Sequence, residues 1–198
     1  MKILITGSKG FIGTYLFNYL DLRKKYELTE LPVRLEDDIG PYFEGQDFVI
    51  HLAAKKQKYT SEEIYQVNVK GTEKVAQLCL KYRCKLINIS SKAVYNSESE
   101  YGRSKLKAEK IIENLVKQGL KAISIRPTTI YNERIISWFR NGEWYSMKKL
   151  AKDIENLIDD SFEYRTIDLE TNHNKYKFIK RPIFRVLRKI EKICLINL

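Results

Sequence analysis

Residues 7–13 read Gly-Ser-Lys-Gly-Phe-Ile-Gly and set three glycines at the spacing G-x-x-G-x-x-G. The apolar run 2–6 directly before them predicts a buried strand, and the apolar side chains of 11–20 recur at helical spacing. Glycine has no Cβ, so such a loop can turn tightly and lie close against a ligand. The unpaired amides at the start of a helix, together with the helix dipole, favour an anion. The stretch therefore predicts a phosphate-binding loop; the alternative is a glycine-rich turn that holds no ligand.

The alternation of strand and helix continues for two-thirds of the chain. Further strands are expected over 27–33, 47–52, 85–90 and 121–126, and further helices over 61–82 and 101–118. Ser61 is expected to cap the first of these helices. Apolar strands that alternate with amphipathic helices are typical of a parallel sheet covered on both faces. The sequence thus predicts an α/β fold with a doubly wound, Rossmann-like parallel sheet, in which ligands bind at the carboxyl ends of the strands.

The pattern weakens after residue 132. A helix is expected over 147–159, a short strand over 165–169, and a helix with one apolar and one basic face over 182–193. The net charge of the chain is +11, and residues 173–198 hold eight basic residues against one acidic residue. The basic character therefore belongs mainly to this tail, and no nucleic-acid partner is expected. We favour a tail that packs on the domain; the alternatives for 178–198 are an anionic membrane surface and another macromolecular partner.

Cysteine and histidine usage gives no sign of a disulfide framework or a metal site. The three cysteines, Cys79, Cys84 and Cys194, have no metal-binding spacing and are expected to be small buried hydrophobes in a reducing compartment. The two histidines, His51 and His173, have no clustered carboxylates or thiols in the sequence. No apolar run reaches the roughly 18–20 residues of a membrane span, so a cytoplasmic protein is expected, with contact to the inner membrane face as an open possibility.

The residues after the second expected strand bear on which dinucleotide the glycine loop would hold. A carboxylate at the end of that strand bonds the ribose 2′-hydroxyl of NAD, whereas an arginine accommodates the 2′-phosphate of NADP. If the strand continues to Val33, Arg34 follows it directly, with Glu36 and Asp37 just beyond. Arg34 and the loop residue Lys9 favour a phosphate, so NADP(H) is slightly preferred over NAD(H). The alternative for Arg34 is a solvated surface charge.

Six short motifs follow one another along residues 1–132. They are Thr6-Gly7-Ser8-Lys9-Gly10-Phe11-Ile12-Gly13, His51-Leu52-Ala53-Ala54, Asn68-Val69-Lys70-Gly71-Thr72, Ser90-Ser91-Lys92-Ala93-Val94-Tyr95, Tyr101-Gly102-Arg103-Ser104-Lys105 and Arg126-Pro127-Thr128-Thr129-Ile130-Tyr131. Each motif alone is weak, but the set in this order is specific. The sequence resembles the extended short-chain dehydrogenase/reductase family, which contains the nucleotide-sugar epimerases, dehydratases and reductases.

The resemblance implies catalytic roles for Ser91, Tyr101 and Lys105. Ser91 would hold the substrate oxygen while Tyr101 transfers a proton. Lys105, four residues after Tyr101 on the same helix face, would lower the pKa of the phenol and bond the nicotinamide ribose. The alternative for the Tyr101–Lys105 pair is the start of an ordinary amphipathic helix.

The resemblance also implies the residues that contact the cofactor, NADP(H) or NAD(H). They are Gly7, Lys9, Gly10, Phe11, Ile12, Gly13, Arg34, Leu52, Ala53, Ala54, Asn68, Tyr101 and Lys105. Asn68 is expected to shape the site through backbone contacts, and the small side chains of Ala53 and Ala54 to leave room beside the cofactor.

Three features depart from the family pattern. One is Thr129-Ile130-Tyr131-Asn132, which stands where the family usually has Asn-Val-Tyr-Gly; the other two concern the substrate region. Five residues separate Tyr95 from Tyr101, where the family generally has a much longer loop over the substrate, and the C-terminal substrate region is short. We expect residues 1–132 to form the dinucleotide-binding domain, 133–172 a reduced substrate region and 173–198 the basic tail. The substrate that the resemblance implies is a nucleotide-linked sugar, and epimerisation, reduction and dehydration stay open. The alternative is a non-catalytic NAD(P)-binding sensor or scaffold, in solution or at a membrane surface. The family also implies a homodimer.

Overall fold

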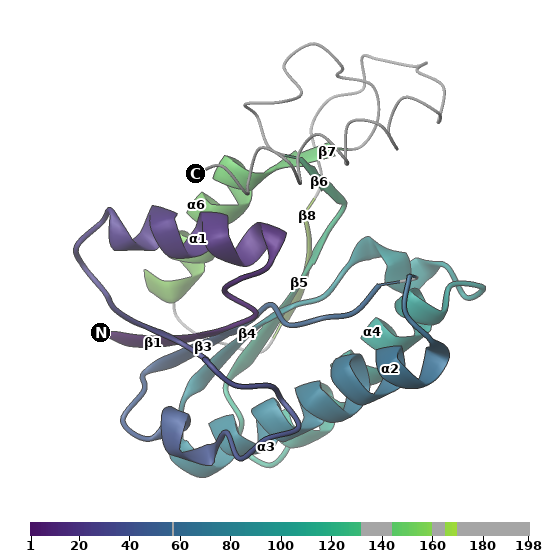
Figure 1. Ribbon diagram of the computed structural model, residues 1–198, viewed down its shortest axis with the longest axis horizontal. Coiled ribbons are helices and arrows are strands. Elements are labelled where there is room, and N and C mark those ends of the chain that lie inside the picture. The colour runs from purple at the N-terminus through teal and green to yellow at the C-terminus, as the bar shows by residue number, and fades with distance from the viewer. Residues whose placement is uncertain (57, 132–143, 160–164, 170–198) are drawn as a thin grey trace.

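Six parallel strands form the central sheet, in the order β2-β1-β3-β4-β5-β8 (Figure 1). The computed structural model describes residues 1–56, 58–131, 144–159 and 165–169. The strands are β1 (Lys2–Thr6), β2 (Glu27–Glu30), β3 (Phe48–His51), β4 (Lys85–Ile89), β5 (Ala122–Pro127) and β8 (Arg165–Leu169). From β1 the chain passes to β2 at the edge and then returns across β1 to β3. Open α/β sheets bind ligands outside the carboxyl ends of the strands at such a reversal.

The side chains of each strand alternate between two apolar layers. Along β1, Ile3 and Ile5 join one layer and Leu4 joins the other. The covering helices are α1 (Phe11–Asp21) and α6 (Met147–Asp159) on the first layer, and α3 (Thr72–Tyr82) and α4 (Glu100–Val116) on the second (Figure 1). The predicted doubly wound α/β fold is therefore confirmed.

The segment expected as one helix over 61–82 consists of three parts. α2 (Ser61–Tyr65) leads into a π-helical turn, Gln66–Gly71, which continues into α3. The cap is Thr60 and not Ser61, because the Thr60 hydroxyl accepts from the Glu63 amide while the Glu63 carboxylate accepts from the Thr60 amide. The π turn widens the helix beside the end of β3, and such turns are frequent at functional sites.

β2 is shorter than the sequence suggested. It ends at Glu30 and not at Val33, because Pro32 has no N–H to continue a ladder with β1. The remaining elements are 3-10 turns at Gly40–Phe43 and Lys92–Tyr95, and a small pair of strands, β6 (Thr129–Tyr131) and β7 (Trp144–Ser146).

Residues 147–169 take part in the same layered unit. α6 packs on α1, where Glu155 accepts a hydrogen bond from Tyr19 at 2.9 Å and pairs with Arg23 at 3.2 Å. β8 extends the sheet beside β5. The expected boundaries after residues 132 and 172 concern which segment binds the cofactor and which binds the substrate. They stay a prediction. The expected helix over 182–193, together with His173 and Cys194, lies outside the described residues.

Three features of the described residues bear on the sequence expectations. No helix in the described ranges is both long and apolar enough to span a membrane. In the same part of the chain no group of three or more His, Cys, Asp or Glu side chains is arranged to hold a metal ion. Cys79 and Cys84 are buried free thiols.

Candidate active site and dinucleotide-binding loop

The glycine loop lies between β1 and α1 and packs against the chain that leaves β3. Gly7 has a backbone φ of +71°, a conformation that residues with a side chain rarely adopt. A Cβ on Gly7 would lie 2.7 Å from the amide nitrogen of Ala53, and a Cβ on Gly13 would lie 2.1 Å from the Gly7 carbonyl oxygen. Both distances are shorter than real Cβ contacts, so the loop requires glycine at these two positions.

The start of α1 has the features expected of an anion site. Gly10 is the N-cap and offers no side-chain acceptor, and the first turn of the helix has no acidic residue. The first amides of a helix have no acceptor within it, so those of Phe11, Ile12 and Gly13 are placed to bind an anion at the positive end of the helix dipole. Lys9, in the same loop, is exposed. The structure therefore brings together the loop residues that the sequence proposed for the cofactor.

A buried histidine joins the ends of β1 and β3. His51 Nδ1 lies 2.6 Å from Thr6 Oγ1, and its Nε2 lies 3.0 Å from Thr72 Oγ1. The Thr72 hydroxyl donates to the Asn68 carbonyl at 2.7 Å. It must therefore accept from Nε2–H, which leaves Nδ1 to accept from Thr6. Burial and, to a smaller extent, the charge of Lys105 together lower the pKa of His51 to about 3. The imidazole is thus neutral and serves to fix the strand ends below the glycine loop.

Asn68 lies in the π-helical turn and holds the chain that leaves β3. Its Oδ1 accepts from the Lys55 amide at 2.8 Å, and its Nδ2 donates to the Lys55 carbonyl at 2.8 Å. The same side chain donates to Ser104 Oγ at 2.9 Å, and Ser104 donates to the Tyr101 carbonyl at 2.8 Å. The expected backbone contacts of Asn68 are therefore present. They connect Lys55 to the start of α4. Lys55 directly follows the segment 52–54, which is predicted to lie beside the cofactor.

Ser91 and Tyr101 meet at the carboxyl end of β4. Ser91 precedes the 3-10 turn Lys92–Tyr95, and its hydroxyl is hydrogen-bonded to the Tyr101 phenol in the first turn of α4. Gly102 permits this approach, because a Cβ there would lie 2.0 Å from the Ala93 carbonyl oxygen. The structure thus brings two of the three proposed catalytic side chains into direct contact.

Local hydrogen bonds close the short connection between Tyr95 and Tyr101. Arg103 Nη1 donates to the Ser97 carbonyl at 2.6 Å, and the side chain of Ser99 caps α4. The connection is therefore a tight turn, and it takes the place of the longer loop that the family resemblance implies.

Lys105 lies one helical turn beyond Tyr101, with its side chain almost entirely buried. Its Nζ donates to the Ile89 carbonyl at the end of β4, at 2.8 Å. The pKa of Lys105 is lowered to about 8, chiefly by burial, with the Glu109 charge acting to raise it and the Lys56 charge to lower it. The buried ammonium therefore loses its proton at a lower pH than an ordinary lysine does.

The expected activation of Tyr101 by Lys105 is not what this structure contains. Burial raises the pKa of Tyr101, and the hydrogen bond from Ser91 lowers it in part. The activation stays a prediction, and two features of the structure bear on it. The phenol is shielded from water, and the Lys105 ammonium is directed at the Ile89 carbonyl.

The carboxylate at the end of β2 is Glu30, which sequence reasoning missed. Ser8 Oγ, in the glycine loop, donates to Glu30 Oε2 at 3.0 Å. The expected strand over 27–33 hid this residue, although its spacing of about 20 residues from the loop is the signal that marks such a carboxylate. Arg34 lies beyond the strand in an exposed turn, where its amide donates to the Asp37 carboxylate at 2.9 Å.

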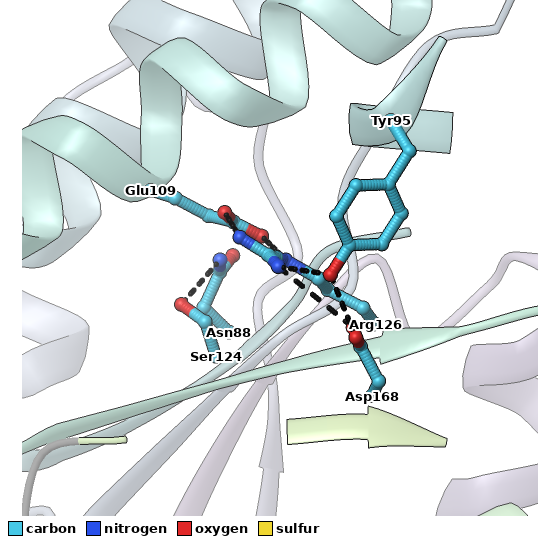
Figure 2. A network of polar contacts seen from close by, with 6 residues as sticks. All are labelled: Asn88, Tyr95, Glu109, Ser124, Arg126 and Asp168. Carbon is cyan, nitrogen blue, oxygen red and sulfur yellow. Dashed lines mark hydrogen bonds and ion pairs between the residues drawn. The ribbon is translucent and has the colours of Figure 1, made fainter. Parts of the chain in front are cut away.

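A polar network joins α4 and the turn after β4 to the ends of β5 and β8 (Figure 2). Arg126 donates through Nε and Nη2 to the Glu109 carboxylate, at 2.9 and 2.6 Å. Its Nη1 donates to the Tyr95 hydroxyl at 2.7 Å, and Tyr95 donates to Asp168 Oδ2 at 2.6 Å. Arg126 stood in a motif of the sequence, but Glu109 and Asp168 were not predicted. No local pattern links Asp168 to Tyr95, because they lie 73 residues apart.

Two buried polar atoms lie on β4 and just beyond it. Asn88 Nδ2 donates to Ser124 Oγ at 3.2 Å (Figure 2). Asn88 Oδ1 and Ser90 Oγ are buried and have no hydrogen-bond partner among the described residues. Ser90 directly precedes Ser91, so the carboxyl end of β4 has hydrogen-bonding capacity that the described part of the chain does not use.

The sheet, the glycine loop and the Ser91–Tyr101–Lys105 group define an extended short-chain dehydrogenase/reductase. The chain belongs to the NAD dependent epimerase/dehydratase family, which it matches over residues 3–167. This confirms the resemblance drawn from the six motifs and the prediction of an NAD(P)-dependent enzyme. A search of curated proteins found no match.

Solved structures of nucleotide-sugar enzymes share the fold. The UDP-glucuronic acid 4-epimerase of Bacillus cereus, in complex with NAD, has a TM-score of 0.76 at 18% identity, over 87% of this chain and 78% of its own. A dTDP-4-dehydrorhamnose reductase of Clostridium acetobutylicum has a TM-score of 0.75 at 20% identity, over 87% and 75%. The dTDP-4-dehydrorhamnose reductase of Bacillus anthracis, in complex with NADP, has a TM-score of 0.73 at 18% identity, over 87% and 76%. At 18–20% sequence identity, the similarity to these structures shows a shared fold.

Proposed function

We propose that the chain binds NAD(H) at its glycine loop and uses Ser91, Tyr101 and Lys105 to oxidise or reduce a nucleotide-linked sugar. The observation that carries the proposal is the Ser91–Tyr101 hydrogen bond, which lies at the carboxyl end of β4 with Lys105 anchored beside it. In a doubly wound sheet this edge also receives a ligand held at the first glycine loop.

The residues at the glycine loop fit a dinucleotide pyrophosphate. A Cβ on Gly7 or Gly13 would overlap the backbone of neighbouring residues, so glycine is needed for the loop to turn this tightly at the start of α1. The uncapped amides at the start of α1 supply hydrogen bonds to an anion. At the other end of the site, Ser90 Oγ offers a buried hydroxyl with no partner among the described residues. These features support a ligand that extends from the loop toward β4.

Glu30 supports NAD(H) over NADP(H). Its carboxylate accepts from Ser8 in the glycine loop and ends β2, the position from which a carboxylate bonds the ribose 2′-hydroxyl. A 2′-phosphate at that place would meet a like charge. This proposal reverses the slight preference for NADP(H) that the sequence position of Arg34 suggested.

Each catalytic side chain has a separate task in the proposal. Tyr101 would pass a proton to or from the sugar oxygen, and Ser91 would hold that oxygen in place. A bound nicotinamide would supply hydride transfer. Lys105, freed from the Ile89 carbonyl, would bond the cofactor ribose, and its charge would then favour the Tyr101 phenolate. Asn68 would keep Lys55 and Ser104 in register with this group.

The substrate class rests on the family and on the enzymes that share the fold. The family is one of epimerases and dehydratases, and the structural neighbours named above act on UDP- and dTDP-linked sugars. The tight turn between Tyr95 and Tyr101 supports a site more open than one covered by a long loop. The proposal does not choose between epimerisation, reduction and dehydration.

The test is a turnover screen with the purified full chain. UDP- and dTDP-linked sugars are incubated with each oxidised and reduced nicotinamide dinucleotide. The sugar is followed by proton NMR, and the cofactor by its reduced-nicotinamide absorbance. Conversion of at least one sugar in the presence of NAD⁺ or NADH is expected. Binding of the dinucleotide with no conversion of any sugar would favour the alternative of a non-catalytic sensor or scaffold.

A further inference from the structure

Glu109 lies one helical turn beyond Lys105, as Lys105 lies one turn beyond Tyr101. Residues spaced by four share one face of a helix, so α4 presents a phenol, an ammonium and a carboxylate in a row. The side chains of Lys105 and Glu109 are both buried, with residue exposures of 2% and 4%. The row therefore places a carboxylate directly behind the lysine of the proposed catalytic group.

A buried ammonium is stabilised by a nearby negative charge. The groups around Lys105 differ in whether they attract the ammonium, repel it or are neutral. The Ile89 carbonyl of β4 accepts one hydrogen bond. His51 on β3 is neutral, because its pKa is lowered to about 3. Lys56, which follows β3, repels the ammonium, whereas Glu109 on α4 attracts it. Among the described residues, Glu109 is thus the acidic group that opposes the effect of burial on Lys105.

The Glu109 carboxylate is held in place from the sheet (Figure 2). Arg126 makes two parallel hydrogen bonds to it, a geometry that fixes orientation as well as distance. The same guanidinium donates to Tyr95 and lies 3.8 Å from Asp168. Glu109 follows Tyr101 by eight residues on α4, with Lys105 midway between them, so the lysine is the group through which the carboxylate can act on the proposed catalytic site.

We infer that Glu109, held by Arg126, is a positioning residue that keeps the buried Lys105 ammonium charged beside the carboxyl end of β4. The part of this inference that concerns catalysis rests on the proposed function. The part that concerns the charge of Lys105 does not, and it can be measured without any substrate.

The first experiment titrates Lys105 directly. The full chain is produced with lysine labelled at the ε-carbon with ¹³C, and the Lys105 signal is assigned by its loss in Lys105→Arg. The signal is expected to titrate at lower pH in Glu109→Gln than in the wild type, and Glu109→Asp is expected to restore part of the difference. Glu113→Gln, an exposed carboxylate one turn further along α4, is the matched control and should leave the titration unchanged.

A second readout uses the pH dependence of turnover. Loss of the carboxylate should move the alkaline limb of kcat to lower pH, because Lys105 would release its proton earlier. A purely structural role would lower kcat at every pH alike. If Glu109→Gln does not fold, the double variant Glu109→Gln/Arg126→Gln replaces the ion pair with a neutral pair and is titrated in the same way. A Lys105 signal that titrates at the wild-type pH without the carboxylate would overturn the inference. An inactive wild-type protein would count against the proposed function alone, since the titration still decides the role of Glu109.

Discussion

Ser8 in the glycine loop donates a 3.0 Å hydrogen bond to Glu30 at the end of β2. The contact joins the proposed pyrophosphate site to the place where the adenosine ribose of a dinucleotide lies in this kind of sheet. Glu30 was not predicted from the sequence, because the strand was expected to extend to Val33 and Arg34 was expected to follow it.

Replacement of Glu30 by Gln should reduce the preference for NAD⁺. A hydrogen bond to a charged group contributes about 1.5–3 kcal/mol, so NAD⁺ affinity should fall roughly tenfold or more, while NADP⁺ affinity should rise as the like charge is removed. Calorimetric titration of both dinucleotides measures the change. Glu27→Gln, at the opposite end of β2, is the control and should bind as the wild type does. Equal losses for NAD⁺ and NADP⁺ in Glu30→Gln would show that Glu30 does not read the 2′ position.

Replacement of Tyr101 by Phe should abolish proton transfer and spare cofactor binding. General acid–base groups contribute about 10²–10⁴-fold to the rate, so kcat on the best sugar nucleotide should fall by that order. The dissociation constant of NAD⁺ should change little, because the ring and the Lys105 ammonium remain. Tyr82→Phe, at the end of α3, serves as the matched control. Undiminished turnover in Tyr101→Phe would remove Tyr101 from the mechanism.

Replacement of Gly13 by Ala should destabilise the fold as well as the loop. The new Cβ would lie 2.1 Å from the Gly7 carbonyl oxygen, and overpacking of this kind costs about 1–3 kcal/mol or more. Gly40→Ala is the comparison, because its Cβ would meet only side-chain atoms at 3.4 Å or beyond. The free energy of unfolding in urea should fall clearly for Gly13→Ala and little for Gly40→Ala. Similar values for the two variants would contradict the packing of the loop described above.

His51 should make the stability of the protein depend on pH in the acid range. Its pKa is about 3 in the folded protein, against 6.5 for an ordinary histidine. Between these values the unfolded chain binds a proton that the folded chain does not, so stability is full above about pH 6.5 and falls as the pH decreases toward 3. In His51→Gln this component is absent. The difference in unfolding free energy between wild type and variant should therefore shrink as the pH is lowered, and a constant difference would count against a buried neutral imidazole.

The features that could be predicted from the sequence are those set by short stretches of residues. The spacing of Gly7, Gly10 and Gly13 between an apolar strand and a helix predicted the loop, and the motif order predicted that Ser91 and Tyr101 would meet. Strand and helix periodicity likewise predicted the two apolar layers, because period and side-chain direction are local properties.

The sequence could not predict contacts that depend on strand register and on burial. Glu30 was missed because the end of β2 depends on where Pro32 stops pairing with β1. The partnership of Tyr95 with Asp168 arises only when β8 joins β5. The raised pKa of Tyr101 was missed for a different reason: the spacing to Lys105 is visible in the sequence, but the degree of burial is not.

The central claim, that the amides at the start of α1 receive the diphosphate of a nicotinamide dinucleotide, is tested most directly by calorimetric titration of the full chain. NAD⁺, NADH, NADP⁺ and NADPH are each titrated under the same conditions. We predict saturable binding with NAD(H) tighter than NADP(H), and loss of that binding when Gly10 is replaced by Glu, which would set a negative charge at the helix N-cap. Absence of measurable binding for all four dinucleotides would contradict the account.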